Sequence, residues 1–374
     1  MAITMTADAQ PRSLRPELGD RSLFPALEPH AYLNHAAVSP PSAPVQAAAT
    51  ALLADYGARG LTAAIAAAGL RQRLREQLAQ LLGAEADDIG LIQSTTAGVV
   101  AIARSITFRA GDRVLLFEGE FPANVTPWQA VAQERALGLL RVPLAPFFRS
   151  TAEGLMHVEQ ALRQGVRLVA VSAVQFQSGL RMPLRELSTL CHAYGAELFV
   201  DAIQGLGALP LDVAALELDY LVAGGHKFLM GLEGVGVLYV RRAAMQRLSL
   251  GLAGWTGHED AFSFLQGEPG LLRHDRAVLR RASFVEQGAL SMVGCAALSA
   301  SLSILLTLGV EAIFAHVTRY LDALEAGLCA LGLRSLRASD AARRSASLCM
   351  QLPERLSAAD FVRVGGRRCR HLHA

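Results

Sequence analysis

The 374-residue sequence is short of lysine: of its 35 basic residues, 34 are arginine and only Lys227 is not. Arginine can replace lysine in most surface ion pairs, but its guanidinium stays protonated and has no free amine lone pair. A single lysine in a chain so rich in arginine therefore suggests a position that needs an amine. The count alone leaves a surface lysine as an alternative, so the neighbouring motifs must decide between them.

Cysteine is also scarce and scattered. The five cysteines form no CxxC pair, and an odd number without close spacing argues against a disulfide framework or a zinc site, so we expect no metal. The first residues contain no basic segment followed by an apolar one, which predicts a flexible arm over residues 1–20 and not a signal peptide. Both features favour a reducing cytoplasm.

Charge of one sign is not in excess. The formal net charge is +2, and no dense basic stretch precedes the last dozen residues, so nucleic acid is not an expected partner. Residues 288–313 contain one charge, Glu311, and are long enough to span a membrane. Small residues and serines interleave with the large ones, so we expect one long helix buried between domains or subunits, and no membrane partner.

The chain is rich in short apolar runs that alternate with helical stretches such as 125–137, 156–164 and 183–194. Several runs are apolar throughout, which is typical of strands covered on both faces. The alternation predicts an α/β fold with a mostly parallel sheet flanked by helices. The predicted strands are Asp88–Gln93, Arg113–Glu118, Leu139–Val142, Arg167–Ala173, Glu197–Asp201, Tyr220–Ala223 and Gly234–Val240.

The length and the 52% hydrophobic composition suit two domains. After about residue 285 the pattern changes to long helices and weaker strands, which predicts a smaller C-terminal α+β domain. We therefore expect a large domain over residues 21–284, whose first part (21–65) packs near the small domain. The small domain is expected over residues 285–374.

Polar residues follow four of the predicted strands. They are Ser94 to Thr96, Glu120 with Phe121, Asp201, and His226 with Lys227. The carboxyl ends of parallel strands meet at one edge of a sheet, where ligands bind in such folds. We therefore expect these residues to converge.

The pair formed by Asp201 and Lys227 matches what pyridoxal phosphate (PLP) requires of a protein. That cofactor needs a lysine amine, an anion at its pyridine nitrogen, a donor to its phenolic oxygen, a phosphate cradle and a flat partner for its ring. Asp201 suits the pyridine nitrogen and Gln204 the phenolic oxygen. Lys227 follows a glycine pair, which allows close backbone approach, and His226 can donate to a phosphate. A strand-end turn and a surface lysine are the alternatives.

Two other segments complete the constellation. QSTTAGVVAIARS is a hydroxyl-rich turn before a helix, and free N–H groups at a helix start bind anions, so Thr95 and Thr96 are phosphate candidates. A helix cap without a ligand is the alternative. Phe121 can stack on the cofactor ring, with an ordinary core position as the alternative.

These motifs occur in the order found in one family. With YLNHAAVSPPSAPV, VQFQSGLRMPLREL and SFVEQGALSMVGCAALSASL, the sequence from residue 32 to 302 resembles the class V aminotransferases. This family of fold-type-I PLP enzymes includes cysteine desulfurases and proteins like isopenicillin-N epimerase. The resemblance implies an enzyme acting on an α-amino acid as a homodimer. It also implies that Lys227 is the catalytic Schiff-base lysine, and that the cofactor is bound by Thr95, Thr96, Phe121, Asp201, Gln204, His226 and, across the dimer interface, Gly288.

The sequence departs from the family pattern at several positions. The Gly-Thr pair of the dimer interface reads Gly288-Ala289, and a Ser-Gly-His-Lys motif reads Gly224-Gly225-His226-Lys227, so two hydroxyls are lost. Phe176 aligns with an asparagine of desulfurase-like members. That difference argues against desulfurase chemistry more than against PLP binding.

The ending, FVRVGGRRCRHLHA, has no recognisable form of the family's carboxylate-binding arginine strand, so we expect a truncated or diverged end. Arg363, Arg367 and Arg368 are candidate carboxylate clamps. RVGGRRC loosely resembles a desulfurase loop that carries a nucleophilic cysteine, but Cys369 falls one residue late, and we predict that it is not catalytic.

Three interpretations follow from the sequence. The first is a PLP enzyme that performs transamination, epimerisation or β-elimination on an amino acid, with cysteine desulfurase as an alternative reaction. The second is a catalytically impaired binding protein that keeps the fold. The third is an unrelated α/β protein in which GGHK arose by chance.

Overall fold

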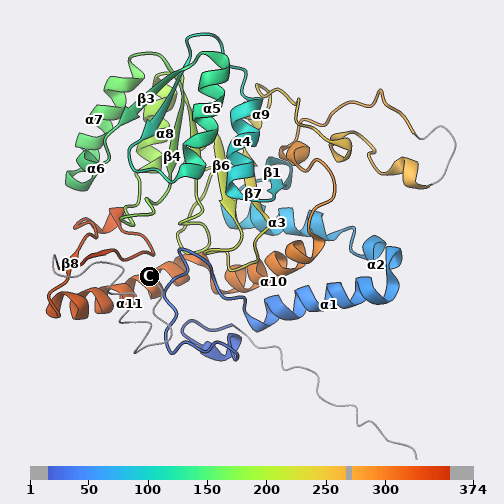
Figure 1. Cartoon of the computed structure of the whole chain (residues 1–374), viewed down its shortest axis with the longest axis horizontal. Helices are drawn as coiled ribbons and strands as arrows, with labels where there is room; N and C mark the ends of the chain where they lie inside the picture. The colour runs from blue at the N-terminus through green and yellow to red at the C-terminus, as the bar shows by residue number, and fades with distance from the viewer. Residues whose placement is uncertain (1–15, 267–271, 354–374) are drawn as a thin grey trace, which may run out of the picture.

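The computed structural model describes residues 16–266 and 272–353, which are built around a seven-stranded sheet (Figure 1). The strand order is β1-β7-β6-β5-β4-β2-β3, and only β7 runs antiparallel to its neighbours, so β1 points the same way as β6. The predicted strands and the mostly parallel sheet are thus confirmed. The strands are β1 Ile89–Ile92, β2 Arg113–Phe117, β3 Gly138–Val142, β4 Val166–Ser172, β5 Glu197–Asp201, β6 Tyr220–Gly224 and β7 Gly236–Val240.

Both faces of the sheet are buried, as the apolar runs predicted. On β5, Leu198 and Val200 enter one hydrophobic cluster, while Phe199 enters the other. Because successive side chains of a strand point to opposite faces, such a strand must be apolar throughout. The helices of this region are α3 Leu70–Leu82, α4 Thr95–Ser105, α5 Thr126–Arg135, α6 Ala145–Arg149, α7 Thr151–Leu162, α8 Leu184–Ala193 and α9 Arg242–Met245.

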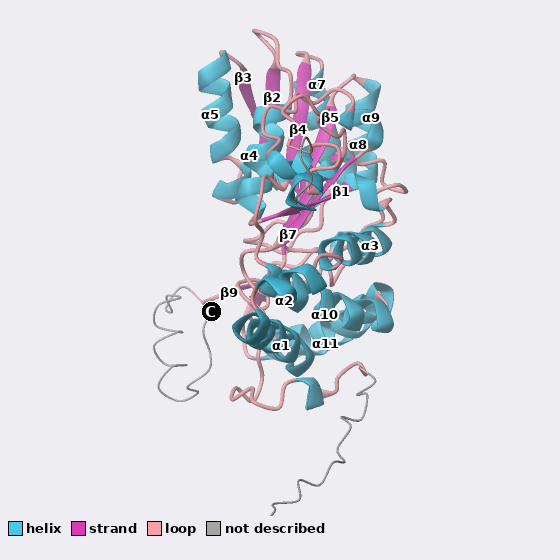
Figure 2. Cartoon of the chain, turned by 90° about the vertical axis from the view of Figure 1, so that its right-hand side faces the viewer, coloured by secondary structure: helices cyan, strands magenta, loops and turns pink. Residues whose placement is uncertain are grey.

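A group of helices lies below the sheet in Figures 1 and 2, where α1 packs against α10. The helices outside the sheet region are α1 Ala43–Arg59, α2 Leu61–Ala66, α10 Met292–Leu308 and α11 Val310–Ala330. The short strands β8 Arg334–Ser335 and β9 Met350–Gln351 form a second sheet. The 3-10 turns are η1 Arg21–Leu23, η2 Ala86–Asp88, η3 Pro122–Asn124, η4 Trp255–Gly257, η5 Ser263–Gln266, η6 Ala282–Val285 and η7 Ala341–Arg343.

The prediction of one long helix over residues 288–313 is wrong. The run is split into α10 and α11, which meet at an angle of 79°. Gly309 lies at the break with φ of 78°, a conformation that glycine adopts without the cost that other residues incur. Within the described residues no single helix is long and apolar enough to cross a membrane, and only this bent pair, taken together, meets that test.

Several predictions concern residues outside the described ranges. They include most of the arm at 1–20 and all of Arg363, Arg367, Arg368 and Cys369. The boundary between a large and a small domain near residue 285 stays a prediction.

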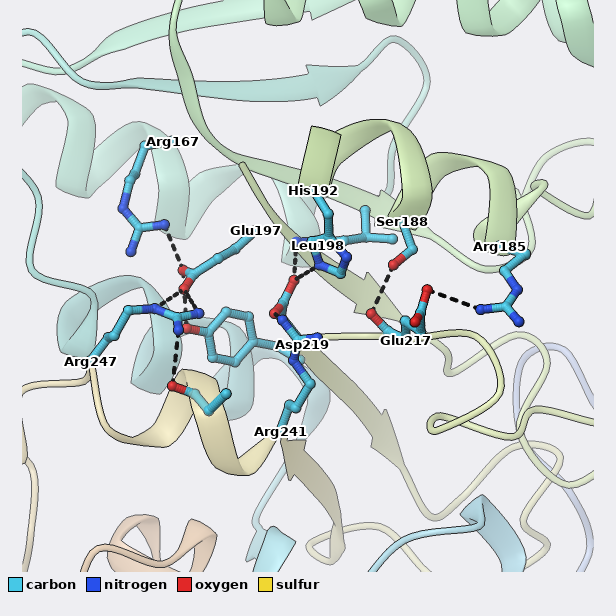
Figure 3. Close-up of polar contacts among 12 residues, drawn as sticks. Arg167, Arg185, Ser188, His192, Glu197, Leu198, Glu217, Asp219, Arg241 and Arg247 are labelled. Carbon is cyan, nitrogen blue, oxygen red and sulfur yellow. Dashed lines mark hydrogen bonds and ion pairs between the residues drawn. The ribbon is translucent and has the colours of Figure 1, made fainter. Parts of the chain in front are cut away.

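Two buried carboxylates connect the strands at the edge of the sheet where the parallel strands begin (Figure 3). Asp219 accepts hydrogen bonds from Leu198 N at 2.9 Å and from Arg241, and His192 Nε2 lies 2.8 Å from it. Glu197 accepts from the Tyr220 hydroxyl at 3.1 Å and pairs with two further arginines, Arg167 and Arg247. These contacts join the starts of β4, β5 and β6 with the end of β7.

Replacement of Asp219 by alanine should therefore destabilise the fold strongly. The Asp219 side chain is fully buried, and its loss leaves Arg241 and Leu198 N without their acceptor. We expect the free energy of unfolding to fall by about 3 kcal/mol, which is the lower end of the range for breaking a buried ion pair. The lower end applies because Arg241 is one-third exposed.

The measurement is urea unfolding of the parent and the variant. Asp87→Ala is the matched control, because Asp87 forms an exposed ion pair with Arg281 at 3.5 Å and its loss should cost under about 1 kcal/mol. Equal losses in the two variants would contradict a structural role for Asp219.

Candidate functional site

The residues predicted to carry chemistry gather at the carboxyl edge of the sheet. Asp201 ends β5, Phe121 follows β2, and Lys227 lies three residues after β6. β1, β2, β5 and β6 all point toward this edge, so the segments after them meet there. The start of α4 joins them directly, because the Thr95 hydroxyl oxygen accepts a hydrogen bond from Gly224 N at 2.9 Å.

The loop that carries Lys227 is held tightly. The Lys227 carbonyl oxygen accepts hydrogen bonds from Met230 N at 2.8 Å and from the Ser39 hydroxyl at 2.6 Å. Met230 has φ of 55°, a left-handed conformation that is costly for a side chain of this kind and often marks functional loops. A Cβ atom at Gly225 would lie 2.7 Å from the Val235 carbonyl oxygen, so only glycine fits there, as predicted from the glycine pair.

The amine of Lys227 lies over an aromatic ring. Its Nζ is 5.7 Å from the centre of the Phe121 ring, within the range of a cation–π contact. Burial lowers the pKa of the Lys227 amine, and the charge of Asp201 partly opposes that change. A lowered pKa increases the fraction of neutral amine, which is the form that attacks a carbonyl carbon.

Asp201 is 2% exposed and faces little water. One of its carboxylate oxygens accepts a hydrogen bond from Ile203 N at 3.0 Å. Burial raises the pKa of this carboxyl to about 7; the Ile203 bond opposes the rise and the charge of Glu120 adds to it. A carboxylate in this setting is stabilised by a cationic donor, and a protonated pyridine nitrogen is one.

Gln204 is also largely buried, and its side chain points to the N-terminal segment. Its Nε2 donates to the Ala36 carbonyl oxygen at 3.1 Å, while its Oε1 is buried and has no hydrogen-bond partner among the described residues. Such an atom is costly to bury, and ligand binding or an amide flip would relieve it. Gln204 therefore has hydrogen-bonding capacity left for a ligand.

The predicted phosphate cradle has the expected local structure. Ser94 caps α4 by accepting from Ala97 N at 3.1 Å, and the helix begins at Thr95. The first N–H groups of a helix have no partner within it, so those of Thr95 and Thr96 are available to an anion. Thr95 is buried and Thr96 exposed. Burial, followed by the charge of Lys227, lowers the pKa of His226, so this imidazole is neutral at physiological pH.

Gly288 has different neighbours from the other predicted residues. Its carbonyl oxygen accepts a hydrogen bond from Arg71 of α3 at 3.2 Å, and the indole nitrogen of Trp255 would lie 3.3 Å from a Cβ at this position. Neither neighbour belongs to the Lys227 cluster. A role for Gly288 at the cofactor therefore depends on a second subunit, as the resemblance implied.

Sequence reasoning did not assign a role to three residues that the fold brings to this site. Ser39 N donates to the His226 carbonyl oxygen at 2.8 Å, in addition to the Ser39 hydroxyl bond to Lys227. His35 Nδ1 lies 2.8 Å from the same hydroxyl. The third is Glu120, which directly precedes Phe121 in the sequence and is 8% exposed. The only signal for the first two was the motif YLNHAAVSPP, which carried the resemblance without a function for its side chains.

The residues present fit PLP. Among the described residues, the site offers a partly buried amine, a buried carboxylate that forms no ion pair, a side-chain amide whose Nε2 carries a second N–H beside the one that bonds to Ala36, a helix start and a half-exposed phenylalanine ring. Those are the groups that the cofactor's aldehyde, pyridine nitrogen, phenolic oxygen, phosphate and ring require.

Solved structures confirm the fold class. An apo cysteine desulfurase from Thermococcus onnurineus NA1 has a TM-score of 0.76 and 24% identity, over 89% of this chain and 81% of that one. A mutant of C-DES with glycine covalently linked to its PLP cofactor has a TM-score of 0.83 and 23% identity, over 93% and 90%. The fold is that of the fold-type-I PLP-dependent enzymes.

The family follows from the sequence comparison. The family model for class-V aminotransferases matches residues 31–364, so the chain belongs to the class-V aminotransferase family, whose cofactor is PLP. A cysteine desulfurase of Escherichia coli O1:K1 / APEC is 32% identical over 245 residues. These residues make up 61% of this chain and 59% of that protein, so the match spans less than two thirds of the relative's length.

Proposed function

We propose that the protein is a PLP-dependent enzyme that acts on an α-amino acid, with Lys227 as the residue that binds the cofactor covalently. The observation that carries this proposal is the position of the chain's only lysine, whose amine lies over the Phe121 ring and interacts with the charge of buried Asp201. Membership of the class-V aminotransferase family supports it.

Each residue has a defined task in this proposal. When bound, PLP supplies an electron-withdrawing ring that stabilises negative charge at the substrate Cα. Asp201 would hold the proton of the ring nitrogen, and Phe121 would pack against the ring. Nζ of Lys227 would hold the cofactor and, in its free form, would accept the Cα proton and return it. Thr95, Thr96 and His226 donate to the phosphate.

We also propose a homodimer located in the cytoplasm. Gly288 lies beside Trp255, which is 47% exposed and packs edge-on against Phe262, itself 53% exposed. Exposed aromatic residues that contact each other are typical of interfaces. Free cysteines at the described positions support a reducing compartment.

A second candidate reaction is cysteine desulfuration, which the relatives named above favour. Against it stands Phe176, whose ring packs edge-on against Phe121 with the centres 5.2 Å apart. An exposed apolar ring at this position offers no hydrogen bond to a polar substrate group. The geometry therefore favours a substrate with an apolar side chain over cysteine.

A panel of amino acids tests these candidates. We expect apolar amino acids to change the absorption of the PLP-loaded protein and to be converted. Sulfide release from L-cysteine should be weak, and it should be the same in the parent and in Cys369→Ser. The reason is that Cys369 falls one residue late in a sequence that only loosely resembles the family's cysteine loop. Strong release that disappears in Cys369→Ser would instead make the protein a desulfurase. A protein that binds PLP but converts no amino acid would be the impaired binding protein.

A further inference from the structure

Glu120 is a buried carboxylate that the proposed mechanism does not use. It follows β2, is 8% exposed, and forms no ion pair with any residue in the described part of the chain. Burying a charge is costly unless it is well hydrogen-bonded. A buried acid kept beside a ligand site therefore requires a specific explanation.

Four donors surround the Glu120 carboxylate. Oε1 accepts from Ser172 N at 2.8 Å and from Gln175 Nε2 at 2.8 Å. Oε2 accepts from Asn124 Nδ2 at 3.1 Å and from the Ser172 hydroxyl. All four donors are uncharged. Four hydrogen bonds therefore hold the Glu120 carboxylate in one orientation.

These donors belong to the segments that position the candidate cofactor residues. Ser172 pairs with Asp201 across β4 and β5, and Asp201 O accepts from Ala173 N at 2.8 Å. Gln175 directly precedes Phe176, and Glu120 directly precedes Phe121. The hydrogen bond from Gln175 to the Glu120 carboxylate therefore connects the two segments that carry the aromatic pair.

The charge of Glu120 also acts at a distance. It contributes to the raised pKa of Asp201, after burial as the main cause. Any group that takes up a proton near Asp201 is subject to the same negative potential.

We propose that Glu120 is a positioning residue, whose carboxylate fixes Phe121 and Phe176 around the cofactor ring and adds its negative charge to that of Asp201. The inference rests on the proposed function. It concerns a residue that acts through others and does not itself touch the cofactor.

The test uses the full-length protein and the variant Glu120→Gln, which removes the charge and keeps the shape. PLP binding to the cofactor-free protein should weaken roughly tenfold, as expected for the loss of one nearby charge. The midpoint of the pH-dependent change in the bound cofactor's absorption should move to lower pH, because removing an anion lowers the proton affinity of its surroundings. A merely structural role would not move this midpoint.

Matched variants separate charge from packing. Glu118→Gln is the control, because Glu118 is exposed two residues away and its loss should change neither quantity. Glu120→Asp keeps the charge and shortens the side chain, so it should weaken binding but keep the parental midpoint. An equal midpoint in the parent and in Glu120→Gln would overturn the electrostatic role.

A further variant keeps the inference testable if Glu120→Gln fails to fold. Gln175→Leu removes one donor to Glu120, while Ser172 N still donates to the same oxygen. It also removes Gln175 Oε1, which is buried without a partner among the described residues, so it should cost less stability than removal of the carboxylate. It should weaken PLP binding several-fold, and unchanged binding would overturn the positioning role. If the parent protein does not bind PLP, both the proposed function and this inference are wrong. If the parent binds PLP and the Glu120 and Gln175 variants bind it equally well, only this inference is wrong.

Discussion

Replacement of Lys227 by alanine is expected to abolish covalent attachment of PLP and to lower amino-acid turnover by at least about a thousandfold. The variant loses both the nucleophilic amine and the base that accepts the Cα proton. No other side chain can substitute, because the sequence contains no second lysine. Some PLP should still bind weakly through its phosphate at the start of α4.

Reduction with borohydride followed by peptide mapping measures this directly. The pyridoxyl label should appear on the peptide that contains Lys227 and nowhere else. Lys227→Arg is the matched control for charge: it keeps a cation over Phe121 but has no free amine, so it should remain unlabelled and inactive. A label found only at the N-terminal amine would show that the assignment of Lys227 is wrong.

Asp201→Asn is expected to give a coloured protein whose turnover is lower by about a hundredfold or more, the scale of a lost electrostatic contact in a catalytic site. The amide has nearly the same shape as the carboxylate and can keep the bond from Ile203 N. It carries no charge, so the ring nitrogen binds its proton less tightly and the ring stabilises negative charge less well.

The comparison requires turnover and absorption spectra of the parent, Asp201→Asn and Asp212→Asn. Asp212 is exposed, accepts a hydrogen bond from Ala215 N at 2.7 Å and has no role in the proposed mechanism, so its variant controls for a general loss of one acid. Turnover of Asp201→Asn at the parental rate would exclude Asp201 as the partner of the ring nitrogen.

Much of the fold could be predicted because buried parallel strands leave a strong local pattern. The run LFVD ends in Asp201 and is apolar up to it, since both faces of β5 are covered. The helix prediction at residues 288–313 failed for an equally clear reason. Composition indicated one buried helix, whereas the bend at Gly309 depends on backbone conformation, which apolar composition does not encode.

The candidate site was predicted only in part. Asp201 and Lys227 were found because their residue types and spacing match one cofactor. Glu120, by contrast, was visible only as a polar residue after a strand. Its four hydrogen bonds come from residues up to 55 positions away, and no local pattern predicts such contacts.

The sequence by itself determined the strand pattern, the single amine and the family. Each of these depends on residue types within a short segment or on the order of motifs along the chain. Tertiary structure decided how the site is assembled. Ser39 holds the Lys227 carbonyl across 188 residues of sequence, and β1 reaches the shared edge only because β7 reverses direction between it and β6. The physical reason is that these contacts form only when distant segments pack together, and their stability depends on the surrounding burial and not on the local sequence.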